Sequence, residues 1–107
     1  MGWTVEFLNA RVRAEIDALP DDMQAKFLRI AETIQAIGLE RMREPPVKHL
    51  EGKLWEMRMT GRDGTSRAIY VTALGRRVVV LRAFLKKMQR TPRSELEIAR
   101  QRAKEVK

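Results

Sequence analysis

The chain has 107 residues and a formal net charge of +8, which is enough length for one domain with a modest core. It contains no cysteine, which excludes thiol catalysis, a disulfide framework and a zinc site that uses cysteine. No apolar run approaches the roughly 20 residues that a membrane span requires, and no signal peptide is recognisable, so we expect one domain over residues 1–107 in the cytoplasm.

The first part of the chain predicts a short strand followed by a helical hairpin. Trp3 to Leu8 alternates as a strand does, and Asn9 then offers an N-cap for a helix. Pro20 interrupts the helical pattern and suits the start of a second helix, which Gly38 ends. The apolar residues at helical spacing are Val12, Ile16, Leu19, Met23, Phe27, Ile30, Ile34 and Ile37. They predict a stripe that packs on a flat surface.

Residues 39–53 predict a connector, because Glu44-Pro45-Pro46-Val47 suits neither a helix nor a central strand. Three strand-like runs follow at close spacing, over residues 54–60, 66–74 and 78–84. Short turns with glycine separate them, which predicts an antiparallel meander. We expect one face of this sheet to carry the helical hairpin and the other face to be partly open.

A last helix is predicted from Thr91 as N-cap and Pro92 as first helical residue. Its apolar stripe is narrow and consists of Leu96, Ala99, Ala103 and Val106. So weak a stripe predicts loose docking or dependence on a partner. The expected fold class is therefore α+β, with an N-terminal strand and a helical hairpin packed on a small, mainly antiparallel sheet, plus a C-terminal helix.

Positive charge is concentrated in the second part of the chain. Residues 1–44 hold 6 lysines and arginines against 8 acidic residues, whereas residues 45–107 hold 16 against 6. This asymmetry favours one electropositive face and a polyanionic partner, RNA or DNA. The alternative is that basic side chains only keep a small protein soluble. The charges are spread over strands and do not form an amphipathic helix, which disfavours a membrane surface.

Three arginines are expected on the sheet. Arg58 lies on the polar face of its strand, Arg67 opens the next strand, and Arg82 interrupts an otherwise apolar run. Same-face residues on adjacent antiparallel strands lie about 5 Å apart, so these side chains would converge on the open face. The alternative is that each arginine pairs with an acid such as Glu56. The stretch 76–92 ends in a cationic turn that adds Lys86, Lys87 and Arg90.

Such a cation cluster permits metal-free cleavage of RNA by its own 2′-hydroxyl group. Arginine and lysine stabilise the charge that develops on the phosphate, and a lysine among cations can act as a general base. The sequence has no metal-ligand spacing and no phosphate-binding glycine loop, so we expect neither a metal nor a small-molecule cofactor. His49 stands alone and is more typical of a surface residue than of a catalytic one.

Several motifs in combination resemble type II toxins of the RelE/ParE superfamily, in particular the phage-derived HigB-like branch. The motifs are Leu54-Trp55-Glu56-Met57-Arg58, then Arg67-Ala68-Ile69-Tyr70, then Phe84-Leu85-Lys86-Lys87 before Thr91-Pro92. The resemblance spans nearly the full length. It implies a RelE-like fold and an mRNA interferase, a ribosome-dependent endonuclease that cuts mRNA and inhibits translation. It also implies a cognate helix-turn-helix (HigA-like) antitoxin.

The resemblance assigns the expected site residues as well. The catalytic cations are Arg58, Arg67, Lys86 and Lys87, and the further RNA contacts are His49, Lys53, Arg82 and Arg90. Some relatives carry a C-terminal tyrosine at the site, but the single tyrosine here is Tyr70, which we expect to be structural. The general base is therefore left open. The alternatives are a ParE-like DNA gyrase inhibitor and a non-catalytic nucleic-acid-binding phage accessory protein.

Overall fold

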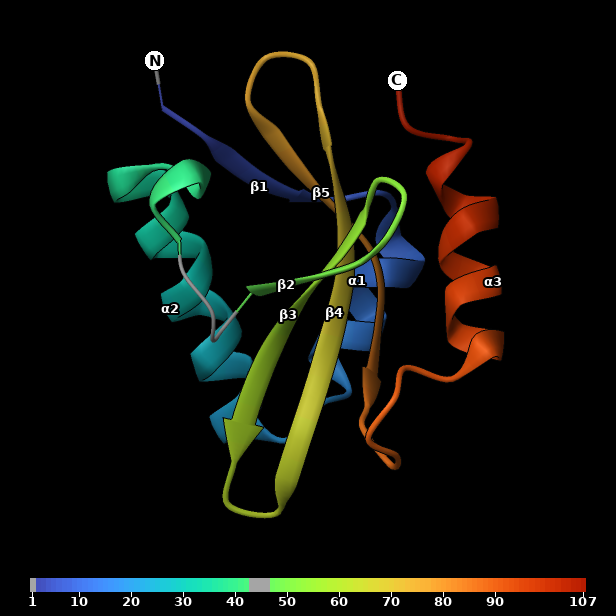
Figure 1. The fold of residues 1–107 in the computed structure, drawn as a ribbon. Coiled ribbons are helices and arrows are strands. Elements are labelled where there is room, and N and C mark those ends of the chain that lie inside the picture. Colours follow the sequence, from blue (N-terminus) through green and yellow to red (C-terminus); the bar gives the residue numbers. More distant parts are fainter. Residues whose placement is uncertain (1, 43–46) are drawn as a thin grey trace.

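A five-stranded sheet with helices on both faces forms the framework of the molecule (Figure 1). The structure, a computed structural model, describes residues 2–42 and 47–107. The strands are β1 Thr4–Phe7, β2 Val47–Glu51, β3 Leu54–Gly61, β4 Gly64–Ala73 and β5 Arg77–Leu85, in the spatial order β1-β5-β4-β3-β2. Strands β2 to β5 form an antiparallel meander, and β1 joins β5 in parallel. The predicted α+β class and mainly antiparallel sheet are confirmed.

The helical hairpin also forms as predicted. Helix α1 spans Ala10–Asp17, and the Asn9 side chain caps it by accepting a hydrogen bond from the Val12 amide at 3.1 Å. Helix α2 spans Asp21–Ile37 and ends at Gly38, whose φ of 92° lies in the region that favours glycine. The apolar stripe of both helices packs against one sheet face, where it meets Met57, Met59, Ala68, Tyr70, Val78 and Val80.

The predicted connector was wrong over much of its length. Residues Leu39–Arg41 form a short 3-10 helix, and β2 is an edge strand that pairs with β3, with Val47 opposite Met57. An edge strand has a partner on one side only, and this one buries Val47 while Lys48 and His49 stay exposed, so it lacks the apolar signature of a central strand. The proline pair of the motif lies outside the described residues.

The second face of the sheet, expected to be partly open, carries helix α3 Arg93–Ala103 (Figure 1). The predicted apolar stripe is confirmed, because Ala99 is fully buried against Ile69, Val79 and Leu81 while the rest of the stripe is partly buried. The helix start differs from the prediction. Pro92 occupies the N-cap position without a side-chain capping bond, and the Thr91 hydroxyl group bonds elsewhere. None of the helices in the described part of the chain is long and apolar enough to cross a bilayer.

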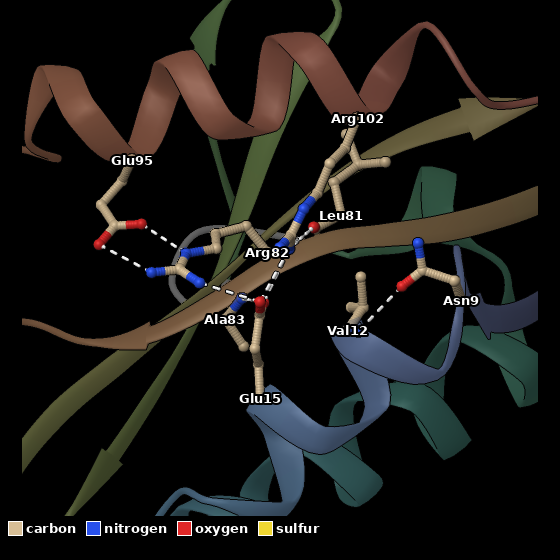
Figure 2. A network of polar contacts seen from close by, with 8 residues as sticks. All are labelled: Asn9, Val12, Glu15, Leu81, Arg82, Ala83, Glu95 and Arg102. Carbon is tan, nitrogen blue, oxygen red and sulfur yellow. Dashed lines mark hydrogen bonds and ion pairs between the residues drawn. The ribbon is translucent and has the colours of Figure 1, made fainter.

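An extra residue in β5 redirects one of the arginines. Val80 pairs with Tyr70 and Arg82 pairs with Ile69, so Leu81 has no partner in β4 and forms a bulge. Beyond the bulge, Arg82 projects between α1 and α3 (Figure 2). Its Nη1 donates to Glu15 at 2.9 Å and its Nε donates to Glu95 at 2.6 Å.

Side chains from the two helices also replace a missing strand at the edge of β5. Strand β1 pairs with β5 only as far as Val80. Further along, the Ala83 amide donates to Glu15 Oε1 at 3.1 Å, and Arg102 Nη1 donates to the Leu81 carbonyl at 2.8 Å (Figure 2). Arg102 and Glu15 are themselves paired at 2.9 Å. Glu15 therefore connects α1, β5 and α3 through three separate donors.

We expect Glu15→Ala to lower the free energy of unfolding by about 3 kcal/mol, because it leaves a backbone amide and two half-buried cations without their acceptor. Urea unfolding followed by circular dichroism measures the change. Glu32→Ala, which removes an exposed carboxylate from α2, is the control and should change stability by less than about 0.5 kcal/mol. Equal effects of the two variants would contradict the bridging role of Glu15.

Candidate functional site

A pocket of about 210 Å³ opens where β2, β3 and β4 meet the cationic turn and the start of α3. Its polar lining consists of Lys48, His49, Glu56, Arg67, Gln89, Arg90 and Thr91. The register explains why these side chains meet. Lys48 lies opposite Glu56 across β2 and β3, and Arg58 lies opposite Arg67 across β3 and β4. The sheet thus places one carboxylate among several cations.

Glu56 is the centre of this group and is fully buried. Its Oε2 accepts a hydrogen bond from Arg58 Nε at 3.0 Å, and its Oε1 accepts one from the Thr91 hydroxyl group at 2.9 Å. Arg67 Nη1 lies 3.5 Å from the same Oε1. A buried carboxylate is stable only with such compensation, so the cations and Glu56 hold one another in place.

Arg67 is equally enclosed, with 1% of its surface exposed. Its Nη1 donates to Thr91 Oγ1 at 2.5 Å, and its Nη2 donates to the Gln89 carbonyl at 2.6 Å. Its Nε is buried and has no hydrogen-bond partner among the described residues. Burial lowers the pKa of the Arg67 guanidinium, and the Arg58 cation adds to that shift while the Glu56 carboxylate opposes it. Arg67 therefore fastens the turn to the sheet.

Of the remaining predicted catalytic cations, Arg58 contacts Glu56, and Lys86 and Lys87 lie in the turn that follows β5. The Arg58 side chain is 32% exposed and keeps part of its guanidinium accessible beside Glu56. Lys86 and Lys87 follow β5 directly, and the Lys86 amide extends the ladder by donating to the Thr65 carbonyl at 2.8 Å. Both lysines belong to the turn but do not line the pocket. Arg90, in the same turn, does line it and is exposed.

Two of the expected RNA contacts lie apart from the pocket. Hydrogen bonding to Glu95 raises the pKa of Arg82, and Glu15 adds a second negative charge, so this arginine is neutralised within the fold. Lys53 lines a different and larger pocket of about 700 Å³ beside the end of α3. The expected convergence of Arg58, Arg67 and Arg82 on an open face is therefore not observed.

His49 borders the pocket but is engaged with the edge of the sheet. It lies opposite Trp55 in the register, and the two rings meet edge to face at 5.0 Å. Its Nε2 lies 2.8 Å from the Gly52 carbonyl, which fixes the ring orientation. In the described ranges, no group of three or more histidine, aspartate and glutamate side chains could hold a metal ion.

Tyr70, the single tyrosine of the chain, belongs to the core. It is 1% exposed, and burial raises the pKa of its phenol from 10.0 to about 12. The phenol therefore remains protonated at neutral pH and lies in the cluster beneath the helical hairpin.

The sequence reasoning missed the central role of Glu56 and the participation of Lys48, Gln89 and Thr91. The alternation in β3 already places Glu56 and Arg58 on one face, so the carboxylate was detectable as more than a counter-ion. Lys48 lies in β2, whereas the sequence predicts a connector there. The sequence predicts Thr91 as an N-cap, whereas its hydroxyl group donates to Glu56 in β3.

Comparison with known proteins agrees with this fold. A chain of the crystal structure of the archaeal RelE–RelB complex from Pyrococcus horikoshii OT3 is similar in structure, with a TM-score of 0.58 and 23% sequence identity over 81% of this chain and 98% of that chain. The present fold is therefore RelE-like. No curated protein sequence matches the chain. The profile of the family "Phage derived protein Gp49-like (DUF891)" matches residues 14–104, and the chain accordingly belongs to this phage-derived Gp49-like family.

Proposed function

We propose that the chain is the toxin of a type II toxin–antitoxin system and cleaves ribosome-bound mRNA without a metal ion. The observation that carries this proposal is the buried Glu56 carboxylate, which pairs with Arg58 and Arg67 beside a pocket that Lys48, Arg67 and Arg90 line. A RelE-like fold and an excess of positive charge in the same half of the chain support it. We also propose that the chain belongs to the HigB-like branch of these toxins.

The chemistry requires charge stabilisation and proton transfer. As the 2′-hydroxyl group attacks the adjacent phosphate, negative charge grows on the phosphate oxygens, and cations placed beforehand lower the barrier. Arg90 is accessible at the pocket, Arg58 is partly accessible beside Glu56, and Lys86 and Lys87 add positive charge to the turn. Lys48, exposed opposite Glu56, adds a further positive charge.

Proton transfer has three candidate groups in this arrangement. Glu56 is the carboxylate nearest the accessible cations, but Arg58 and Thr91 occupy its oxygens. Lys86 and Lys87 are the alternatives, because a lysine amino group can act as a general base and both follow β5 in the cationic turn. Tyr70 is excluded from this role, because its buried phenol holds its proton up to a pH near 12.

The proposal includes two macromolecular partners. The first is the ribosome with its mRNA, whose phosphates complement the net charge of +8. The second is a cognate antitoxin, supported by the structural likeness to a chain from a RelE–RelB complex. Its helix-turn-helix, HigA-like class is part of the proposal and follows from the resemblance to HigB-like toxins. Because the ribosome and the antitoxin would be met in the cytoplasm, we propose a cytoplasmic location.

Expression of the wild-type chain should arrest growth and produce new 5′ ends inside the codons of translated messages, and primer extension detects them. Arg58→Ala and Lys87→Ala should each relieve growth arrest and lower cleavage by about 10- to 100-fold, because each removes charge from the proposed site. Lys104→Ala removes an exposed lysine after α3, away from the pocket, and should remain fully toxic.

Intact message together with gyrase-linked DNA breaks would contradict this function in favour of gyrase inhibition. Binding of RNA without any cleavage would instead indicate the non-catalytic accessory role. Full toxicity of both Arg58→Ala and Lys87→Ala would show that the residues are wrongly assigned even if cleavage occurs.

The Tyr70 assignment predicts an unusual alkaline titration. With one tyrosine in the chain, the absorbance of tyrosinate should rise with a midpoint near pH 12 in the folded protein and near 10 in urea. Because the folded pKa is the higher of the two, the associated stability, about 3 kcal/mol, is present below pH 10 and is lost as the pH rises toward 12. A folded-state midpoint near 10 would show an accessible phenol and would reopen its candidacy as a base.

A further inference from the structure

Arg67 makes its hydrogen bonds to other residues of the protein, so little of its side chain is accessible to a substrate. Only 1% of the residue is exposed, and both terminal nitrogens donate to the segment that ends the cationic turn. Arg58, directly opposite in the register, differs because 32% of its side chain is accessible. Two arginines that lie opposite each other on neighbouring strands therefore occupy different environments.

The segment that Arg67 holds contains an accessible cation. Gln89 contributes its carbonyl and Thr91 its hydroxyl group, and Arg90 lies between them with its side chain exposed at the pocket. Thr91 also donates to Glu56, so the segment is attached to both β3 and β4. In the described part of the chain, these side-chain bonds are the ones that fix residues 89–91 to the sheet.

We infer that Arg67 is a positioning residue that fixes residues 89–91, and with them Arg90, against the sheet without touching RNA. The inference rests on the proposed function for its substrate, but the attachment of the turn can be measured without RNA. A displacement of about 1 Å at a reacting group can lower a rate by about 100-fold, so a residue with no substrate contact can still be essential. The chemical role of Arg67 is thus to hold the turn.

Substitutions of Thr91 distinguish a positioning role of Arg67 from a direct contact with the substrate. Thr91→Val keeps the shape and leaves the Arg67 charge in place, but it removes both the acceptor for Arg67 and the donor to Glu56. Thr91→Ser retains the hydroxyl group and is the matched control. Arg67→Met removes the guanidinium and is compared alone and together with Thr91→Val in a double-mutant cycle.

The first measurement is the backbone ¹⁵N order parameter of residues 89–91 in the full chain without RNA. Arg67→Met and Thr91→Val should each lower it from a rigid value of about 0.85 toward about 0.6, and Thr91→Ser should match the wild type. Unchanged order parameters in Arg67→Met and Thr91→Val would overturn the inference, whatever the protein acts on.

The second measurement is single-turnover cleavage on ribosomes programmed with a short mRNA. Thr91→Val should lower the rate by about 10-fold and Arg67→Met by about 100-fold, with the double variant no slower than Arg67→Met. Thr91→Ser should cleave at the wild-type rate. Wild-type activity in Thr91→Val beside an inactive Arg67→Met would overturn the inference, because Arg67 would then act on the substrate itself.

The third measurement, of RNA binding, tests whether Arg67 contacts the RNA itself or acts through the position of the turn. The probe is ribosome-bound mRNA with a 2′-deoxy nucleotide at the cleavage position, which binds but cannot react. The slope of log K against log salt is negative, and loss of one phosphate contact reduces its magnitude by about 0.7 for a single strand, which we expect for Arg58→Met. For Arg67→Met we expect the slope of Thr91→Val, and a smaller magnitude confined to Arg67→Met would contradict the inference. Lower order parameters in the variants without cleavage by the wild type would refute the proposed function and leave the positioning role intact.

Discussion

The structure around the pocket depends on one electrostatic constraint, the burial of the Glu56 carboxylate. A charge removed from water must be compensated, and here the compensation comes from two arginines on neighbouring strands and a hydroxyl group from the turn. The same contacts that make the carboxylate tolerable also fix where the turn leaves the sheet. The position of Arg90 is therefore a consequence of the burial of Glu56.

A second polar network binds the unpaired backbone of β5, toward the opposite edge of the same sheet. Glu15 and Arg102 satisfy the unpaired backbone of β5, and Arg82 is held between Glu15 and Glu95 (Figure 2). Both networks fasten α3, one at its start and one along its length. Because the apolar stripe of α3 is narrow, with Ala99 its one fully buried residue among those described, these polar contacts determine how the helix sits on the sheet.

Local chemistry in the sequence was sufficient for the elements whose signals are strong. The Asn9 cap, the stripe of α2 and the β-branched run in β5 each predicted the observed element, because each depends on residues close in the chain. The misses share a different cause. The bulge at Leu81, the pairing of β2 and the bond from Thr91 to Glu56 all depend on partners distant in sequence, and no local pattern reports them. The sequence accordingly predicted a set of cations and named Glu56 as a possible partner of an arginine, but not as the buried carboxylate at the centre of the group.

Arginine and lysine make different contacts in this molecule, so the net charge alone does not describe the positive charge at its surface. The ion pairs described here all use arginine, whose planar fork reaches two acceptors at once, as Arg82 does with Glu15 and Glu95. Arg67 likewise bonds two groups of the turn. A count of basic residues therefore overstates the positive surface, because part of the charge is neutralised inside the fold. The accessible positive charge around the pocket lies on Lys48 and Arg90, on part of Arg58 and on the lysines of the turn. The position of the turn depends on the buried Arg67, so the buried charge decides where part of the accessible charge lies.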